Sequence, residues 1–200
     1  DGDMVIVDAN QGEAFVNPDN DLLNDYMKKR EDYNNFRRRL KSLNTLPAVT
    51  SDGRKVELES NIGKPKDVDA ALANGAEGVG LYRTEFLYMD RNNLPTEEVQ
   101  FEAYKKAVTS MGSRRVTIRT LDIGGDKEIA YLGLDKELNP FLGWRAIRFC
   151  LDNPDIFKTQ LRAILRASAY GKVSIMYPMI SDVNEVRRAN KYLDEAKNEL

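Results

Sequence analysis

The chain has 200 residues, a net charge of −2 from 30 Lys+Arg and 32 Asp+Glu, one cysteine and no histidine. The nearly balanced charge gives no strongly basic field of the kind that attracts nucleic acid or acidic membranes, and the single cysteine excludes an intrachain disulfide. The absence of histidine excludes a Ser-His-Asp or Cys-His centre, a histidine-ligated zinc and a histidine general base within this chain. Any chemistry must therefore use Arg, Lys, Asp, Glu, Tyr or Cys, or a group supplied from elsewhere.

The N-terminal part is predicted to be a hairpin followed by a long polar helix. Residues 4–16 fit two short strands with a turn at residues 10–12, and Pro18 ends the second strand because proline cannot continue a ladder. From Asp19 to Leu46 the sequence is highly charged, without Gly or Pro, and Pro47 ends the helix. Its narrow apolar stripe leaves two interpretations open, a surface helix or a connector between domains. The stripe consists of Leu22, Tyr26, Tyr33, Phe36, Leu40 and Leu43.

After Pro47, strands and helices are predicted to alternate four times, which indicates an α/β fold with a parallel sheet and right-handed crossovers. Two architectures fit: an open doubly wound sheet, or the first half of a (β/α)8 barrel. The glycines within residues 75–80 precede a strand, so we interpret them as a helix cap and tight turn rather than a dinucleotide loop. The predicted strands are residues 56–60, 78–82, 115–120 and 173–176, and the predicted helices are residues 65–74, 96–110, 144–151, 155–169 and 182–200.

The two ends of the sequence suggest a piece of a longer protein. The start at Asp1-Gly2-Asp3 is neither a methionine nor a basic signal region, and the chain stops in the middle of its strand–helix pattern. Apolar runs such as residues 4–7 are far shorter than the roughly 20 residues of a membrane-spanning helix. We therefore expect a truncated chain that does not associate with membranes.

Two arginines lie at the carboxyl ends of consecutive predicted strands. Arg83 ends the strand at residues 78–82, and Arg119 lies on the opposite side of its strand from Val116 and Ile118. In βα proteins the carboxyl ends of the strands form the active face. One interpretation is a buried ion pair with Glu85 or Asp122, because a buried arginine is costly unless it is paired. The other is an anion site, in which two guanidinium groups bind a phosphate or carboxylate.

Further basic residues follow the third strand. The loop Asp122-Ile123-Gly124-Gly125-Asp126-Lys127 combines paired glycines, which let backbone amides approach a ligand, with a lysine that could contact a phosphate oxygen. For Arg145 the spacing leaves open a surface position or a place in the same site. Cys150 lies in an apolar helical context and is predicted to be a core residue. The basic run Arg37-Arg38-Arg39 is predicted to be a solvated helix face.

Four motifs, in order, resemble the Enzyme I family of the bacterial phosphotransferase system, the phosphoenolpyruvate–protein phosphotransferases. They are residues 78–86 (GVGLYRTEF), 94–98 (LPTEE), 119–127 (RTLDIGGDK) and 139–148 (NPFLGWRAIR). The resemblance covers nearly the whole chain. It implies the tail of a phosphohistidine swivelling domain at residues 1–18, a linker helix at residues 19–49, and the first half of a phosphoenolpyruvate-binding TIM barrel at residues 50–200.

The resemblance also implies a reaction. Arg83, Arg119, Lys127 and Arg145 match basic residues that bind phosphoenolpyruvate, with Mg²⁺ as cofactor. The family's Mg²⁺ ligands and proton-donating cysteine lie later in the barrel, and its phosphorylated histidine and its carrier-binding domain lie upstream. No metal ligand or catalytic residue is therefore expected here, and the chain alone should be inactive.

In the family, the phosphoryl group passes to a histidine and then to the carrier HPr for sugar uptake, in a cytoplasmic homodimer. Pyruvate phosphate dikinase and phosphoenolpyruvate synthase share the Arg-Thr-Glu motif and are the nearest alternatives. The loop that contains Lys127 and the Leu-Pro-Thr-Glu-Glu segment favour Enzyme I. A non-catalytic module for anion binding or assembly is the alternative from another class.

Overall fold

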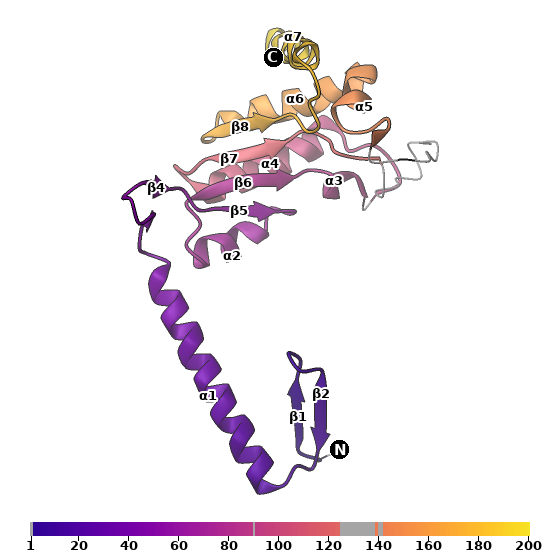
Figure 1. Cartoon of the computed structure of the whole chain (residues 1–200). Coiled ribbons are helices and arrows are strands. Elements are labelled where there is room, and N and C mark those ends of the chain that lie inside the picture. The colour runs from indigo at the N-terminus through magenta and orange to yellow at the C-terminus, as the bar shows by residue number, and fades with distance from the viewer. Residues whose placement is uncertain (1, 90, 125–138, 140–141) are drawn as a thin grey trace. The chain divides into compact units, whose positions relative to one another are not determined.

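The chain forms two compact units, Asp1–Pro47 and Ala48–Leu200 (Figure 1). This computed structural model describes residues 2–89, 91–124, 139 and 142–200.

The first unit contains the predicted hairpin and helix. Strands β1 (Val5–Asp8) and β2 (Glu13–Val16) pair antiparallel. Helix α1 (Asn20–Leu43) begins at Asp19, whose side chain accepts a hydrogen bond of 2.8 Å from the backbone N–H of Leu22. The hairpin contacts the first turns of α1, because the ring centroids of Phe15 and Tyr26 lie 5.7 Å apart. Farther along α1, the apolar stripe is exposed.

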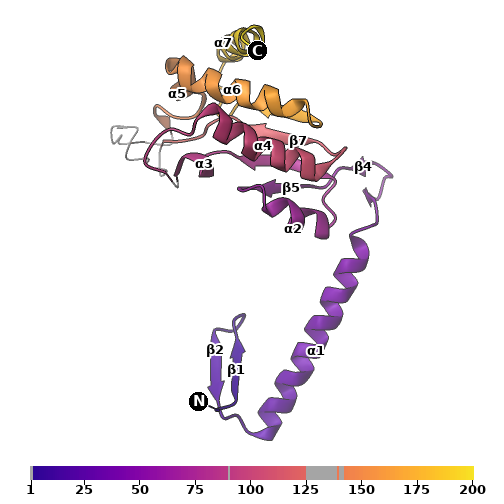
Figure 2. The same ribbon diagram turned by 180° about the vertical axis from the view of Figure 1, so that it is seen from behind.

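The second unit is built on a parallel sheet, which confirms the predicted α/β pattern. Its strands β5 (Glu59–Ile62), β6 (Gly78–Arg83), β7 (Val116–Arg119) and β8 (Val173–Met176) lie side by side in chain order. Figures 1 and 2 show that helices cover one face of this sheet. The helices of this unit, in chain order, are α2 (Asp67–Ala73), α3 (Phe86–Met89), α4 (Glu97–Met111), α5 (Ile147–Asp152), α6 (Pro154–Ser168) and α7 (Val183–Asn198).

The predicted strand at residues 56–60 is wrong. Val56 belongs to a separate hairpin, in which β3 (Ala48–Val49) pairs antiparallel with β4 (Lys55–Val56). The turn between them needs a left-handed residue, which Gly53 provides with φ of +87°. The sheet strand β5 begins only at Glu59, where the parallel pairing with β6 starts. The alternation of apolar and charged residues at Val56-Glu57-Leu58-Glu59 therefore spans two strands that belong to different sheets.

Two further boundaries differ from the prediction. The short helix α3 was not predicted, because its four residues are too few for a helical period. The predicted helix at residues 144–151 begins at Ile147, since Ala146 has φ of +52° and cannot be helical. Thr96 caps α4, and Asp182 caps α7, where it forms a complete capping box with Glu185.

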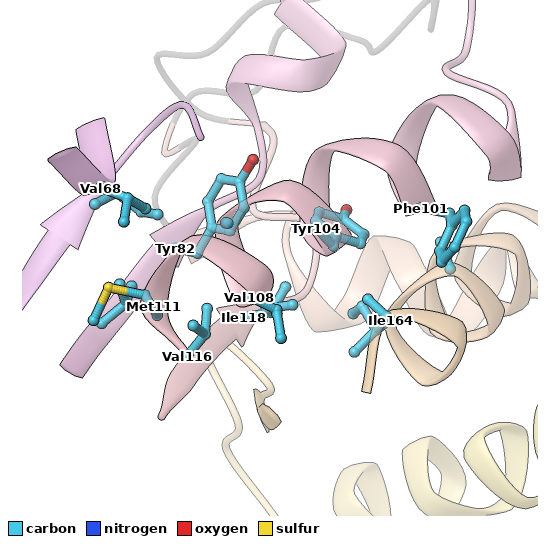
Figure 3. Close-up of a cluster of buried hydrophobic side chains, with 14 residues drawn as sticks. Val68, Tyr82, Phe101, Tyr104, Val108, Met111, Val116, Ile118 and Ile164 are labelled. Atoms are coloured by element: carbon cyan, nitrogen blue, oxygen red, sulfur yellow. The ribbon is translucent and has the colours of Figure 1, made fainter. Parts of the chain in front are cut away.

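The core lies between the sheet and helices α4 and α6. Tyr82, Val116 and Ile118 point from the strands toward Tyr104 of α4 and Ile164 of α6 (Figure 3). Along β7 buried and partly exposed residues alternate, so Thr117 and Arg119 lie on the face away from this core. The strands of an all-parallel sheet are usually covered on both faces. Among the described residues, one face of this sheet is covered by helices and the other remains partly open.

Candidate functional site

Arg83 and Arg119 meet at the carboxyl edge of the sheet. They are the last residues of β6 and β7, and their Cα atoms are partners in the parallel register. The hydrophobic partners of the same strands, Tyr82 and Ile118, are buried in the core on the other face. The alternation of the strands therefore directs both guanidinium groups toward the open face, as the sequence predicted for Arg119.

Arg119 is held by both of the carboxylates that the sequence offered. Its Nη2 lies 2.9 Å from Oε1 of Glu85, and its Nη1 lies 3.0 Å from Oδ2 of Asp122. The side chains are largely buried, with 14% exposure for Arg119, 2% for Glu85 and 9% for Asp122. The predicted buried ion pair is confirmed, and such pairing stabilises a charge that would otherwise be costly to bury.

Arg145 joins the same cluster, which answers a question that the spacing left open. Its Nη2 donates to Oδ1 of Asp122 at 2.8 Å, and the pair is buried. Asp122 thus bridges Arg119 and Arg145, one oxygen to each. The backbone at Gly124 makes this approach possible, because a Cβ there would lie 2.6 Å from Cβ of Arg145.

Arg83 differs from the other two arginines. Within the described ranges no carboxylate lies at ion-pair distance from it, and its guanidinium carbon instead lies 5.1 Å from the ring centroid of Phe86. This distance is typical of a cation–π contact. Phe86 was not predicted to contact Arg83, although its position three residues after Arg83 could have suggested the contact. The ring of Phe86 therefore orients the Arg83 side chain, whose positive charge has no ion-pair partner among the described carboxylates.

Asp67, at the start of α2, interacts electrostatically with Arg83. Hydrogen bonds of 2.9 Å from the backbone N–H groups of Gly63 and Lys64 lower the pKa of Asp67, and the nearby charges of Lys66 and Arg83 lower it further. Oδ2 of Asp67 accepts both of these bonds, so this oxygen binds the loop after β5. Asp67 is therefore ionised at neutral pH, and its charge interacts with that of Arg83 without an ion-pair contact.

The remaining predicted residues have different placements. Lys127 lies outside the residues that the structure describes. Cys150 is buried as predicted; burial, and then the charge of Asp122, raise the pKa of its thiol. Residues 37–39 are exposed on α1. Gln160 was not predicted to belong to the site; it is a buried amide on the apolar face of α6 that bonds to the backbone beside Asp122. An amide in an otherwise apolar helical stripe is a signal that could have found it.

The site does not present a cation-binding set of side chains. Mg²⁺ prefers several oxygen ligands, but Glu85 and Asp122 both pair with arginine. Within the described part of the chain, no group of three or more His, Cys, Asp or Glu is placed to hold a metal ion. The described residues fit an anion and do not fit Mg²⁺.

Comparison with known proteins shows the family to which this chain belongs. Residues 37–200 match the PEP-binding domain of the PEP-utilising enzymes, and the chain therefore belongs to this family. It is 52% identical over 199 residues to the phosphoenolpyruvate-protein phosphotransferase of Staphylococcus carnosus (strain TM300). It is 55% identical over 199 residues to proteins of the same name from Staphylococcus aureus and from Bacillus sp. (strain S).

These alignments cover the whole of the present chain but only part of each relative. The shares are 35% of the two staphylococcal proteins and 34% of the Bacillus protein. The chain thus spans about a third of the length of these relatives. In the described residues, no helix has both the length and the apolar character needed to cross a membrane.

Proposed function

We propose that the carboxyl edge of β6 and β7 binds the phosphate of phosphoenolpyruvate as part of a phosphoenolpyruvate–protein phosphotransferase. The observation that carries this proposal is the contrast between Arg83 and Arg119. Arg119 is held by two carboxylates, whereas Arg83 has no carboxylate at ion-pair distance among the described residues. A phosphate that bridges the two guanidinium groups would supply the negative charge beside Arg83, with bidentate geometry.

Arg145 and Lys127 complete the proposed phosphate cradle. Arg145 shares Asp122 with Arg119, so its charge belongs to the same cluster. Lys127 enters the proposal through the resemblance of residues 119–127 to the family motif. Both would contribute positive charge beside a ligand that carries phosphate and carboxylate groups.

We also propose that the sheet is the first half of a TIM barrel. Its strands follow one another in chain order, β5-β6-β7-β8, without the reversal of order that defines a doubly wound sheet. The helices cover one face, and the partly exposed opposite face carries Arg119. Residues 1–18 would then belong to a phosphohistidine domain and residues 19–49 to a linker helix.

The proposed chemistry explains why arginines are needed. When the phosphoryl group leaves phosphoenolpyruvate, the P–O bond breaks, a P–N bond to a histidine forms, and the enolate takes up a proton to give pyruvate. The phosphoryl oxygens and the leaving enolate carry negative charge through this step, which guanidinium groups stabilise. This chain contains no histidine, so the acceptor must come from another segment or protein. HPr would receive the phosphoryl group afterwards.

The experiment that tests this function is a calorimetric titration of the 200-residue chain with phosphoenolpyruvate, with and without Mg²⁺. We expect saturable, salt-sensitive binding that Arg83→Ala weakens by about tenfold or more, as loss of a charged hydrogen-bond donor implies. Arg115→Ala is the matched control, because Arg115 is exposed just before β7, at the other end of the strand.

Two results would overturn the proposal. One is no binding of phosphoenolpyruvate to the folded chain. The other is equal weakening by Arg83→Ala and Arg115→Ala, which would indicate attraction by surface charge rather than a site. Competition with inorganic phosphate and with pyruvate shows which end of the ligand the arginines bind, and we expect phosphate to compete better.

A further inference from the structure

The backbone ladder between β6 and β7 ends where the candidate site begins. The last paired residues are Arg83 and Arg119. Beyond them, side chains hold the two strand ends together: the hydroxyl of Thr84 donates to the carbonyl oxygen of Arg119 at 2.9 Å. The backbone N–H of Leu121 donates to Oε1 of Gln160 at 2.8 Å. Residues 84 and 121 are direct sequence neighbours of the charged residues in the site.

Gln160 connects these two strand ends from behind the sheet. It lies near the middle of α6 and is fully buried. Its Nε2 donates to the hydroxyl oxygens of Thr84 and Tyr104, each at 3.1 Å. The amide can take only one orientation, because the N–H of Leu121 needs an acceptor and both hydroxyls already donate elsewhere. One side chain thus sets the distance between the segments after β6 and after β7.

A second buried amide, Gln100, lies beside this arrangement without contacting the strand ends. The hydroxyls of Tyr88 and Tyr104 both donate to Oε1 of Gln100, at 3.0 and 3.1 Å. The Nε2 of Gln100 donates to the carbonyl oxygen of Pro95. Gln100 and Gln160 are both buried, at 1% and 0% exposure, and share Tyr104 as a partner. The two amides differ in their contacts with the strand ends, because of the two only Gln160 bonds to Thr84 and Leu121.

We infer that Gln160 is a positioning residue for the phosphoenolpyruvate site: it holds Thr84 and Leu121, and through them Arg83, Arg119 and Asp122, at the spacing that the ligand needs. The inference rests on the proposed function for the identity of the ligand. Gln160 lies on the helix side of the sheet and acts through the backbone, so it does not itself contact the ligand. A buried hydrogen bond that is fully satisfied fixes geometry well, because breaking it leaves an unpaired polar group.

The test compares Gln160→Met with Gln100→Met in the 200-residue chain. Both substitutions keep the side-chain length and remove a buried amide, so both should lower the urea midpoint by similar amounts. Two further readouts separate the variants: the titration with phosphoenolpyruvate, and the NMR signal of the Nε–Hε group of Arg119. We expect Gln160→Met to weaken binding by about tenfold and to shift and broaden the Arg119 signal. Gln100→Met should leave both readouts within about twofold of the parent.

Thr84 provides a second pair of variants in case Gln160→Met does not fold. Thr84→Ser keeps the hydroxyl that accepts from Gln160 and donates to Arg119, whereas Thr84→Val keeps the shape and removes it. We expect Val to reproduce the effect of Gln160→Met and Ser to restore the parent behaviour.

The outcomes distinguish this inference from the proposed function. An unchanged Arg119 signal in Gln160→Met or Thr84→Val overturns the positioning role, and so does an equal change in Gln100→Met. A parent chain that does not bind phosphoenolpyruvate overturns the proposed function instead, while the Arg119 signal still decides whether Gln160 positions the strand ends. Normal binding with a disturbed Arg119 signal also overturns the inference, because the spacing would then not matter to the ligand.

Discussion

Arg83 and Arg119 are direct neighbours across the parallel ladder of β6 and β7, although both carry a positive charge. The two guanidinium groups can be held side by side because Glu85 and Asp122 surround Arg119 with negative charge. Arg83 receives no such partner among the described residues. Under the proposed function the two arginines have different tasks: Arg119 is fixed in a buried network, and Arg83 would bind the anion.

The bridging role of Asp122 gives the first prediction. Asp122→Asn removes the charge shared by Arg119 and Arg145 and turns an NH2 group toward one of them. We expect the free energy of unfolding to fall by about 3 kcal/mol, because a buried guanidinium loses its partner. Urea denaturation at neutral pH measures this loss.

The matched control for Asp122→Asn is Asp194→Asn. Asp194 pairs with Lys197 on the exposed surface of α7, where its side chain is 68% exposed. Its loss should cost less than about 0.5 kcal/mol. A similar small effect for both substitutions would show that the network around Asp122 does not stabilise the fold.

Local patterns predicted most of the second unit. The alternation of strands and helices and the opposite orientation of Arg119 both follow from periods and short-range chemistry. The failure at residues 56–60 is also local in origin. Lys55 and Val56 pair with a strand that lies earlier in the chain, and nothing in their own composition shows which sheet they join.

The sequence predicted contacts within the site only where the interacting residues lie close together in the chain. Glu85 and Asp122 are close in sequence to Arg83 and Arg119, so they were candidates from the start. Gln160 lies 76 residues from Thr84 and 39 from Leu121. The direction of Arg145 depends on the backbone at Gly124. Such contacts come from tertiary packing, which a pattern along the chain does not contain.

Glu97 predicts how stability responds to acid. Burial would raise the pKa of Glu97, but hydrogen bonds from Arg162 and Arg166 outweigh it and lower the pKa. A lowered folded pKa means that this stabilisation is present above the ordinary value of about 4.3 and is lost as the pH falls through the folded value. Glu97→Gln should cost about 1 kcal/mol at pH 7, because the pairs are partly exposed. The difference from the parent should shrink toward pH 3.

The control for Glu97→Gln lies on the same helix. Within the part of the chain that the structure describes, Glu102 pairs only with Lys105, at the surface, and its side chain is 57% exposed. We expect Glu102→Gln to change the free energy of unfolding by less than about 0.5 kcal/mol at either pH. If Glu97→Gln shows the same difference from the parent at pH 7 and at pH 3, ionisation of Glu97 is not the cause.

Gly124 predicts a position where alanine is not tolerated. Its φ is +108°, and a Cβ would lie 2.6 Å from Cβ of Arg145. Gly112 also has a left-handed φ of +61°, but no atom lies within 4 Å of a Cβ there. We expect Gly124→Ala to lower the free energy of unfolding by about 3 kcal/mol and Gly112→Ala by about 1 kcal/mol, because only the first adds a clash to the backbone strain. Equal losses would mean that the contact with Arg145 has no energetic weight.

Cys150 offers a direct probe of the core beneath the site. Its side chain is buried, its Sγ lies 3.7 Å from the carbonyl oxygen of Leu121, and burial raises the pKa of the thiol. The thiolate is the reactive form, so alkylation requires opening of the structure. Since Cys150 is the only cysteine, labelling of the chain with iodoacetamide reports this position alone. We expect the native chain to react at least about a thousandfold more slowly than the chain in urea, because a stable domain opens only rarely. A native rate within about tenfold of the unfolded rate would show that the second cluster of the core, which Cys150 shares with Leu121 and Phe157, opens without global unfolding.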